Sequence, residues 1–370
     1  MSPDVRRPVD RLLLFFALTL MAVGMVWVFS ASAFKSQRTA TTFLVNQLAG
    51  GGIGVAIMLA LSQTDLNTLR DNPRVLQVLY GASLVLLGLV FFFPAVNHAH
   101  RWIRLSRASI QPSELFKPLS VLITAWWMVR HQAAWLKRQD SIPKLLALFA
   151  ILLVPLGLIL REPDFGTTFL ILFVALLVTF LGGAPRWIFA VVAPALGVVG
   201  AAFVWFEPYR RARVLSFLNP AADPLGKGHQ ALQSLIAVGN GGITGVGLGA
   251  SMQKLNYLPE AHTDFIYAVI AEEAGLIGSV LVLALFVGLL WRGYRVASRV
   301  RDSFLKLCAM GFTLLLVVQA FMNISVVLSL APNKGIPLPF ISYGSSSLIA
   351  SMACLGLLLA ISKETGEGAR

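Results

Sequence analysis

The chain has little charge and almost no cysteine. Only 13% of its 370 residues are charged, against roughly 25% in soluble domains, while 57% are hydrophobic and the mean hydropathy is +0.76. This composition argues against a soluble protein and predicts a polytopic membrane protein. The two cysteines, Cys308 and Cys354, both fall inside apolar runs, which argues against a disulfide framework or a zinc knuckle.

Several catalytic signatures are also missing. The sequence has no Ser-His-Asp set with recognisable spacing, no haem motif and no soluble domain large enough for a nucleotide-sugar enzyme. The glycine-rich run 239–249 (GNGGITGVGLG) follows no strand and lacks the Gly-Lys-Ser/Thr ending of a nucleotide-binding loop. A flexible hinge or close packing between segments is the better interpretation of this run.

Acidic residues are also scarce: the chain has 17 Asp and Glu residues and 30 Lys and Arg residues, which gives a net charge of +13. In a soluble protein this excess would suggest a nucleic-acid partner. In a membrane protein, basic loops set the topology and contact anionic lipid headgroups. We therefore predict no nucleic-acid partner.

Long apolar runs dominate what is present. A membrane-spanning helix needs about 20 apolar residues, and the sequence predicts ten: 12–30, 43–61, 76–96, 114–129, 143–160, 166–182, 187–206, 265–290, 307–330 and 343–361. The first follows Arg6, Arg7 and Arg11, as in an uncleaved signal anchor. The expected fold is an all-α polytopic membrane protein, with residues 1–370 forming one transmembrane domain.

Basic residues near the ends of the runs predict the orientation. With both termini in the cytoplasm, inside segments hold 16 Lys and Arg and outside loops hold 12, five of them in the long loop 207–264. That loop is too long to be only a connector. Its apolar stretch 231–238, which includes the candidate cavity residue Gln233, could form a helix in the membrane interface.

Ionisable residues gather at the ends of runs predicted to face outside, and such residues mark a site by default. The segment 257–266 (YLPEAHTDFI) carries Glu260, His262 and Asp264. Thr263 or Asp264 could cap the following helix. Alternatively, Asp264 is a general base, because a carboxylate at an apolar boundary has a raised pKa. Glu260 and His262 would then tune it or orient a substrate.

Two further clusters precede the fourth run and begin the sixth. Arg101 and Arg104 come before Glu114 and Lys117, which are spaced to pair on a helix. This pattern indicates either a local salt bridge with interfacial anchors or cations that hold a diphosphate. In the segment 161–168 (REPDFGTT), Asp164 either caps a helix or lines the cavity as a second acidic group.

The remaining candidates lie in two other outside segments. Tyr209, Arg210 and Arg213 would bind lipid headgroups or capture an anionic lipid substrate. The segment 334–347 (KGIPLPFISYGSSS), with Lys334 and Ser342, has two prolines before small polar residues. It predicts a re-entrant or broken helix that lines a cavity. Glu272 and Glu273 lie deep in the eighth run and receive no role.

Five of these segments, in order along nearly the whole chain, resemble the SEDS family (shape, elongation, division, sporulation). They are 101–103 with 111–114, 163–166, 209–211, 257–265 and 335–344. The segment 251–262 resembles the division members more than the elongation members. The sequence departs from the family pattern at four positions: Ser106, Glu162, His229 and Ser345. Of these, Glu162 stands where glutamine is common.

The resemblance implies a peptidoglycan glycosyltransferase that polymerises lipid II on the outer face of the bacterial cytoplasmic membrane, at the division septum. It implies Asp264 as the base and Glu114, Lys117 and Asp164 as cavity residues. It also implies a class B penicillin-binding protein as partner, together with other membrane proteins of the division machinery. A divalent cation, Mg²⁺ or Mn²⁺, could share the neutralisation of the leaving diphosphate. An elongation polymerase, a lipid II flippase and a non-catalytic scaffold remain as alternatives.

Overall fold

The computed structural model describes residues 9–32, 37–95, 99–105, 108–135, 137–206, 211, 217, 228–255, 258–332 and 335–365. Within them, ten helices overlap the ten predicted runs: α1 (Arg11–Ser32), α2 (Gln37–Leu61), α4 (Pro73–Leu89), α5 (Pro112–Arg130), α7 (Arg138–Arg161), α8 (Phe165–Leu181), α9 (Arg186–Trp205), α12 (Ile266–Arg299), α13 (Ser303–Val327) and α14 (Ser345–Glu364). Shorter elements are α3 (Leu66–Asp71), η1 (Val90–Phe92), α6 (Gln132–Trp135) and α11 (His229–Gly241).

Among the described residues, seven helices are long and apolar enough to cross a membrane: α1, α2, α4, α7, α12, α13 and α14. The prediction of an all-α polytopic membrane protein is confirmed at this level. Ten crossings and cytoplasmic termini stay predictions. The sequence analysis did not predict the antiparallel hairpin of β1 (Ile103–Leu105) and β2 (Ala108–Ile110), whose three-residue strands are too short to give a hydrophobic alternation.

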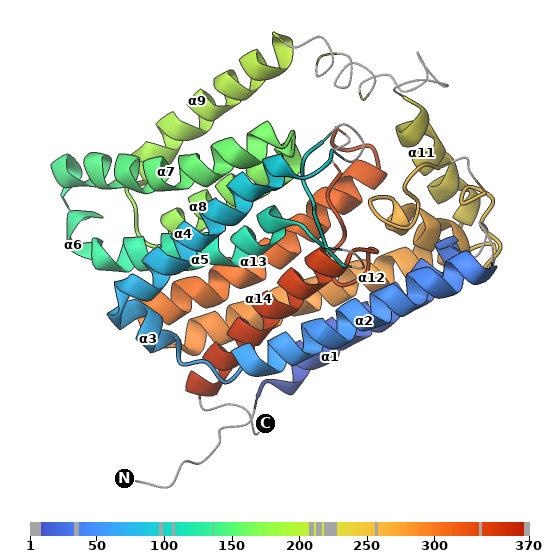
Figure 1. The fold of residues 1–370 in the computed structure, drawn as a ribbon, viewed down its shortest axis with the longest axis horizontal. Helices are drawn as coiled ribbons and strands as arrows, with labels where there is room; N and C mark the ends of the chain where they lie inside the picture. Colours follow the sequence, from blue (N-terminus) through green and yellow to red (C-terminus); the bar gives the residue numbers. More distant parts are fainter. Residues whose placement is uncertain are drawn as a thin grey trace, which may run out of the picture.

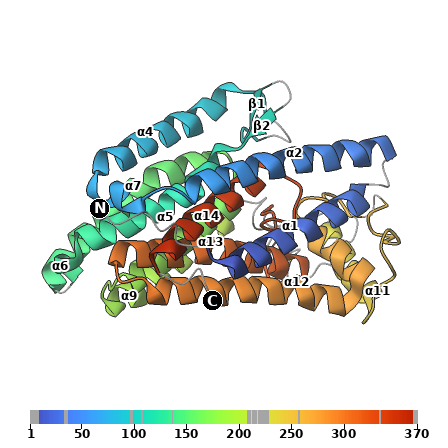
Figure 2. The ribbon, with the colours of Figure 1, turned by 90° about the horizontal axis from the view of Figure 1, so that it is seen from below.

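The helices α13 and α14 form the centre of the bundle. In the most apolar stretch of each, 72% and 83% of residues are buried, against 28% in α1. A helix that is apolar on all sides is stable where protein or lipid covers those sides, and α13 and α14 are covered mainly by protein. The hairpin and α4 lie on one side of these two helices, and α12 lies on the other (Figure 2). The helix α9 lies at the edge of the bundle (Figure 1).

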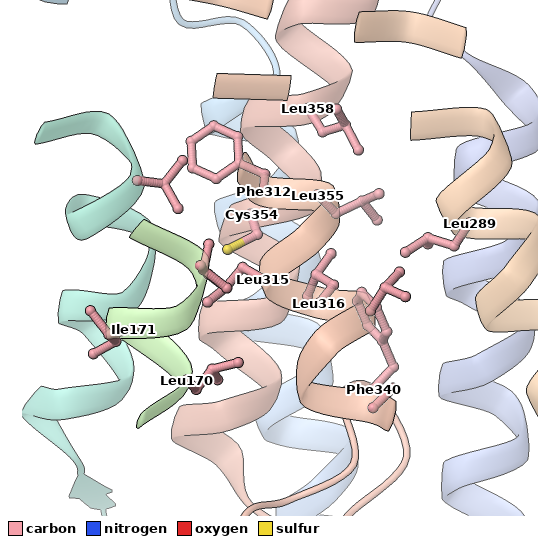
Figure 3. Close-up of a cluster of buried hydrophobic side chains, with 14 of the residues drawn as sticks. Leu170, Ile171, Leu289, Phe312, Leu315, Leu316, Phe340, Cys354, Leu355 and Leu358 are labelled. Atoms are coloured by element: carbon pink, nitrogen blue, oxygen red, sulfur yellow. The ribbon is translucent and has the colours of Figure 1, made fainter. Parts of the chain in front are cut away.

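Labelled side chains of α8, α12, α13, α14 and the segment before α14 meet in this core (Figure 3). Phe312 and Leu316 of α13 pack with Leu355 of α14, and Phe340 joins them from the segment that precedes α14. Cys354 lies in the same cluster, and both cysteines are free and buried, as predicted. Burying each such side chain contributes about 1.5–3 kcal/mol in water, and within lipid the gain comes from dispersion contacts and close packing instead.

Capping side chains set several helix boundaries. Asp302 accepts a hydrogen bond from the Leu305 amide at 2.9 Å, so α13 begins at Ser303 rather than at residue 307. The C-terminal end of α12 also differs from the prediction, because the helix continues to Arg299 rather than ending at residue 290. There Arg292 lies buried against Asp10, with 2.6 Å between Nε and Oδ2. This ion pair allows a charged helical turn to stay packed, which the hydrophobic pattern does not reveal.

The glycine-rich run 239–249 packs into a break in α12. Gly275 has φ 64° and ψ −160°, which interrupts the helix. The amides of Leu276 and Ile277 donate to the carbonyls of Gly242 and Ile243, at 2.9 and 3.2 Å. Backbone groups freed at the break are therefore satisfied by the glycine run, as buried backbone requires. Of the two interpretations of this run, close packing is confirmed.

Replacing Gly275 by Ala should destabilise the protein strongly. A side chain at this positive φ costs about 1–2 kcal/mol, and its Cβ would clash with the Gly245 amide nitrogen. The measurement is the thermal unfolding midpoint of the detergent-solubilised protein. Gly239→Ala is the matched control, because nothing lies within 4 Å of its position. Equal midpoints for the two variants would contradict this account of the break.

The same break brings Glu272 and Glu273 to polar partners. The Glu273 carboxylate accepts from Lys254 Nζ at 2.7 Å and from Ser30 Oγ at 2.7 Å, which joins α12 to α1. Glu272 accepts from the hydroxyl of Ser251 and from the backbone amides of residues 252 and 253. These two carboxylates therefore hold the segment 251–254 against the bundle, a role that the sequence analysis did not find.

Candidate functional site

The site is built around the turn that precedes α12. Phe265 is the N-cap of α12 and no side chain caps the helix, so the cap interpretation of Thr263 and Asp264 is wrong. Backbone contacts hold the turn instead: Asn323 Nδ2 donates to the Asp264 carbonyl at 2.7 Å, and Ser342 Oγ donates to the Thr263 carbonyl at 2.6 Å. The Asp264 carboxylate is thereby left available for chemistry.

The segment 335–344 faces this turn and is not helical, although most of it is buried. Gly335 lies so close that a Cβ there would be 2.9 Å from Asp264 Oδ2. Two polar side chains of α13 hold the segment: Gln319 Nε2 donates to the Pro337 carbonyl at 2.8 Å, and Asn323 Nδ2 also donates to the Ile336 carbonyl at 2.8 Å. The segment is irregular and α14 begins after it, at Ser345, while a re-entrant path that lines a cavity stays a prediction.

Asp264 is partly buried among other carboxylates. Loss of solvation raises the pKa of Asp264 to about 7, the negative charges of Glu260 and Asp164 add to the effect, and Arg101 opposes it. Besides Glu260 of the same turn, the charges that act on Asp264 come from three other parts of the chain, at Arg101, Glu114 and Asp164. Since a general base works best with a pKa near the working pH, this carboxylate suits proton abstraction at neutral pH.

Asp164 and Arg101 join two neighbouring segments of the site. Asp164 Oδ1 accepts from the Thr167 amide at 3.0 Å and caps α8, while its Oδ2 accepts from Gln111 Nε2 at 3.2 Å. The cap interpretation of Asp164 is confirmed, and its charge also acts on Asp264. Arg101 donates to the carbonyls of Glu162 and Pro163 at 2.8 and 2.7 Å.

Glu114 and Lys117 form the predicted salt bridge, with 2.6 Å between Oε1 and Nζ. Both side chains are almost completely buried, and Lys117 also donates to Gln319 Oε1 at 3.0 Å. The pair therefore connects α5 to α13, whose Gln319 in turn holds the segment 335–344. A buried pair of this kind persists only with further hydrogen bonds to its charged groups.

The other predicted residues lie less centrally. Arg104 is exposed on β1, and Gln233 is partly buried on α11. Glu260 is exposed and accepts from Thr263 Oγ1 at 2.9 Å. The His262 ring packs on the Phe43 ring, with centroids 4.9 Å apart. Four predicted residues lie outside the described residues: Tyr209, Arg210, Arg213 and Lys334.

Sequence reasoning missed Gln319 and Asn323, the two amides that hold the segment 335–344. Each is a polar residue inside an otherwise apolar run, and that signal could have found them. In the part of the chain that the structure describes, no three His, Cys, Asp or Glu side chains are arranged to hold a metal ion.

Fold and site together define a polytopic all-α membrane protein with a polar, carboxylate-rich site at the end of its central helices. The chain belongs to the family of cell cycle proteins that comprises FtsW, RodA and SpoVE, whose family model matches residues 10–367. The family expectation drawn from the five segments is therefore confirmed.

Relatives and solved structures agree over nearly the full length. The probable peptidoglycan glycosyltransferase FtsW of Thiomicrospira cyclica is 38% identical, over 97% of this chain and 93% of that protein. Stage V sporulation protein E of Bacillus subtilis is 38% identical, over 96% of each chain. A chain from a peptidoglycan synthase complex that coordinates polymerization and crosslinking superimposes with a TM-score of 0.79 at 32% identity, covering 96% of this chain and 98% of its own. The rod shape determining protein RodA of Thermus thermophilus gives a TM-score of 0.69 at 29% identity, covering 97% and 98%.

Proposed function

We propose that this protein is a peptidoglycan glycosyltransferase that polymerises lipid II into glycan strands during cell division. The observation that carries the proposal is Asp264, a carboxylate with a pKa of about 7 at the edge of a membrane-embedded bundle. Full-length similarity to FtsW proteins supports the reaction class and favours a division role over an elongation role.

In the proposed reaction, Asp264 takes the proton from the 4-hydroxyl of the acceptor sugar. The resulting oxygen attacks the anomeric carbon of the donor sugar, and the bond from that carbon to the lipid diphosphate breaks. A single displacement inverts the configuration at the anomeric carbon. Negative charge grows on the leaving diphosphate, so cations near it lower the barrier. Arg101, the cation that acts on Asp264, is the candidate for this role in the described residues.

The proposed topology has ten crossings, cytoplasmic termini and a site that opens on the outer face of the cytoplasmic membrane. Ten helices overlap the ten predicted runs, which supports this arrangement. The proposed partner is a class B penicillin-binding protein that crosslinks the product. Similarity to a chain from a complex that coordinates polymerization and crosslinking supports such a partner.

The test is polymerisation of labelled lipid II by the purified protein together with its cognate class B penicillin-binding protein. Glycan chains that form with this protein, and not with the partner alone, are the expected result. Lipid II scrambling in proteoliposomes without polymer would favour a flippase instead. No effect of the protein in either assay would leave only a scaffold.

The pH dependence of kcat/KM should show an acid limb with a midpoint at about pH 7. Because burial and neighbouring carboxylates raise the pKa of Asp264, the base is protonated and inactive below this pH and active above it. Replacing Glu260 by Gln removes one of the negative charges that raise this pKa, so the midpoint should move to lower pH. An unchanged midpoint in that variant would argue against Asp264 as the titrating group.

A further inference from the structure

Glu162 is a carboxyl group that the proposed reaction does not use. It follows α7, and its side chain is 0% exposed. Its backbone is satisfied, because the amide donates to the Leu158 carbonyl at 3.1 Å and the carbonyl accepts from Arg101. Within the described residues, however, neither carboxyl oxygen of Glu162 has a hydrogen-bond partner.

An unpartnered buried carboxyl group is costly and needs an explanation. Burying even a neutral polar group without a partner is destabilising, and burying an isolated charge costs far more. Native proteins keep few such groups, and each one is a candidate for a bound ligand or a mechanistic role. These costs argue against a purely structural role for Glu162, because a side chain that only filled space would stabilise the fold more without the carboxyl group.

The charged surroundings of Glu162 favour its neutral form. Loss of solvation and the negative charge of Asp164 raise the pKa of Glu162 to about 8, and Arg101 lowers it only in part. Arg161 on the same turn lies over the Phe91 ring, 5.4 Å from its centroid. At neutral pH the group is therefore mostly a carboxylic acid, with one O–H donor.

A second donor lies beside it. Arg101 uses two of its five N–H donors on the carbonyls of Glu162 and Pro163, and the others have no partner among the described residues. The same guanidinium acts electrostatically on Asp264. The Arg101 guanidinium, whose charge acts on both Glu162 and Asp264, and the neutral O–H of Glu162 form a pair of donors suited to an anionic oxygen.

From this juxtaposition we infer that Glu162 binds a phosphate oxygen of the lipid-linked substrate as a neutral carboxylic acid, beside the Arg101 guanidinium. The inference rests on the proposed function and adds a specific contact to it. A carboxylate in this place would repel the diphosphate, whereas an O–H donates a charge-assisted hydrogen bond to it. Anion binding in turn favours the protonated form, so the two equilibria reinforce each other.

The test compares two variants of the full-length protein in complex with its partner. Glu162→Gln keeps a neutral donor of nearly the same shape. Glu162→Met keeps the length and removes the donor. We expect Glu162→Gln to keep the KM for lipid II within about twofold, and Glu162→Met to raise it about tenfold or more, since hydrogen bonds to charged groups are among the stronger ones. In both, kcat should change little, and the thermal midpoint of Glu162→Met should equal or exceed that of the wild type.

Two further readouts exclude a merely structural role. Undecaprenyl diphosphate, used as the probe in a direct binding assay, should bind Glu162→Gln as it binds the wild type and should bind Glu162→Met about tenfold more weakly. Wild-type affinity for the probe should fall above pH about 8, where Glu162 ionises, and that loss should be absent in Glu162→Gln.

Wild-type affinity in Glu162→Met, or an equal loss in both variants, would overturn the inference. A fall in kcat alone would also overturn it.

The binding assay also separates this inference from the proposed function. If the wild type makes no glycan but binds the probe with the expected order among variants, only the proposed function fails. If the wild type polymerises and all three proteins bind alike, only the inference fails.

Discussion

Replacing Asp264 by Asn should lower the rate of lipid II polymerisation by about 10²- to 10⁴-fold, the usual contribution of a general base. Asn has nearly the same shape but cannot accept the proton at neutral pH. The backbone contacts of the turn, from Asn323 and Ser342, do not involve the Asp264 carboxylate. The variant should therefore fold, bind its partner and bind lipid II, so the loss should lie in kcat rather than in KM.

The measurement is single-turnover polymerisation by the complex, with the thermal midpoint of each variant recorded beside it. Asp140→Asn is the matched control, because Asp140 is exposed in the first turn of α7 and makes the same change of charge. It should polymerise at the wild-type rate. A fully active Asp264→Asn protein would exclude Asp264 as the base, and a variant with a much lower midpoint would show that Asp264 serves the fold.

Replacing Lys117 by Met should destabilise the protein by about 3–5 kcal/mol, because it leaves the buried Glu114 carboxylate without its partner. The same change frees Gln319 Oε1, which now accepts from Lys117 at 3.0 Å. Gln319 holds the segment 335–344 against Asp264. We therefore expect loss of polymerisation as well as a lower thermal midpoint.

A double variant separates the two effects. Combining Lys117→Met with Glu114→Gln removes both charges, and replacing a whole buried pair is often close to neutral for stability. The double variant should regain most of the thermal midpoint that Lys117→Met loses. If Lys117 also contacts substrate, the double variant should remain inactive. If the pair serves only the fold, the activity of the double variant should return together with its stability. Lys306→Met, at an exposed position of α13, is the control for the loss of a positive charge. A stable Lys117→Met protein would contradict the buried-pair account.

Sequence alone located the helices because hydrophobic run length and composition are local properties. It placed ten apolar runs where ten helices lie, and it located Asp264 because an ionisable residue at the end of an apolar run is conspicuous. The pairing of Glu114 with Lys117 was also predictable, since three residues along a helix bring two side chains to one face.

Other features depended on contacts between distant segments. The three-residue strands of the hairpin carry too little pattern to be read from sequence. From the sequence, Asp264 could be a helix cap or a base, and only the structure, with Phe265 at the cap position, excluded the cap. Glu272 and Glu273 received no role, because their partners Ser251, Lys254 and Ser30 come from other parts of the chain.

The sequence by itself determined that the protein is helical and membrane-embedded, which family it belongs to, and which residues carry ionisable groups. These properties follow from composition and from the order of local motifs. Only the tertiary structure decided which of those groups meet. The pKa values of Asp264 and Glu162 arise from burial and from charges on other segments. The break at Gly275 is stable because residues 242–247 supply the missing backbone partners. Electrostatics and hydrogen bonding act through space, so the site is defined by packing rather than by position along the chain.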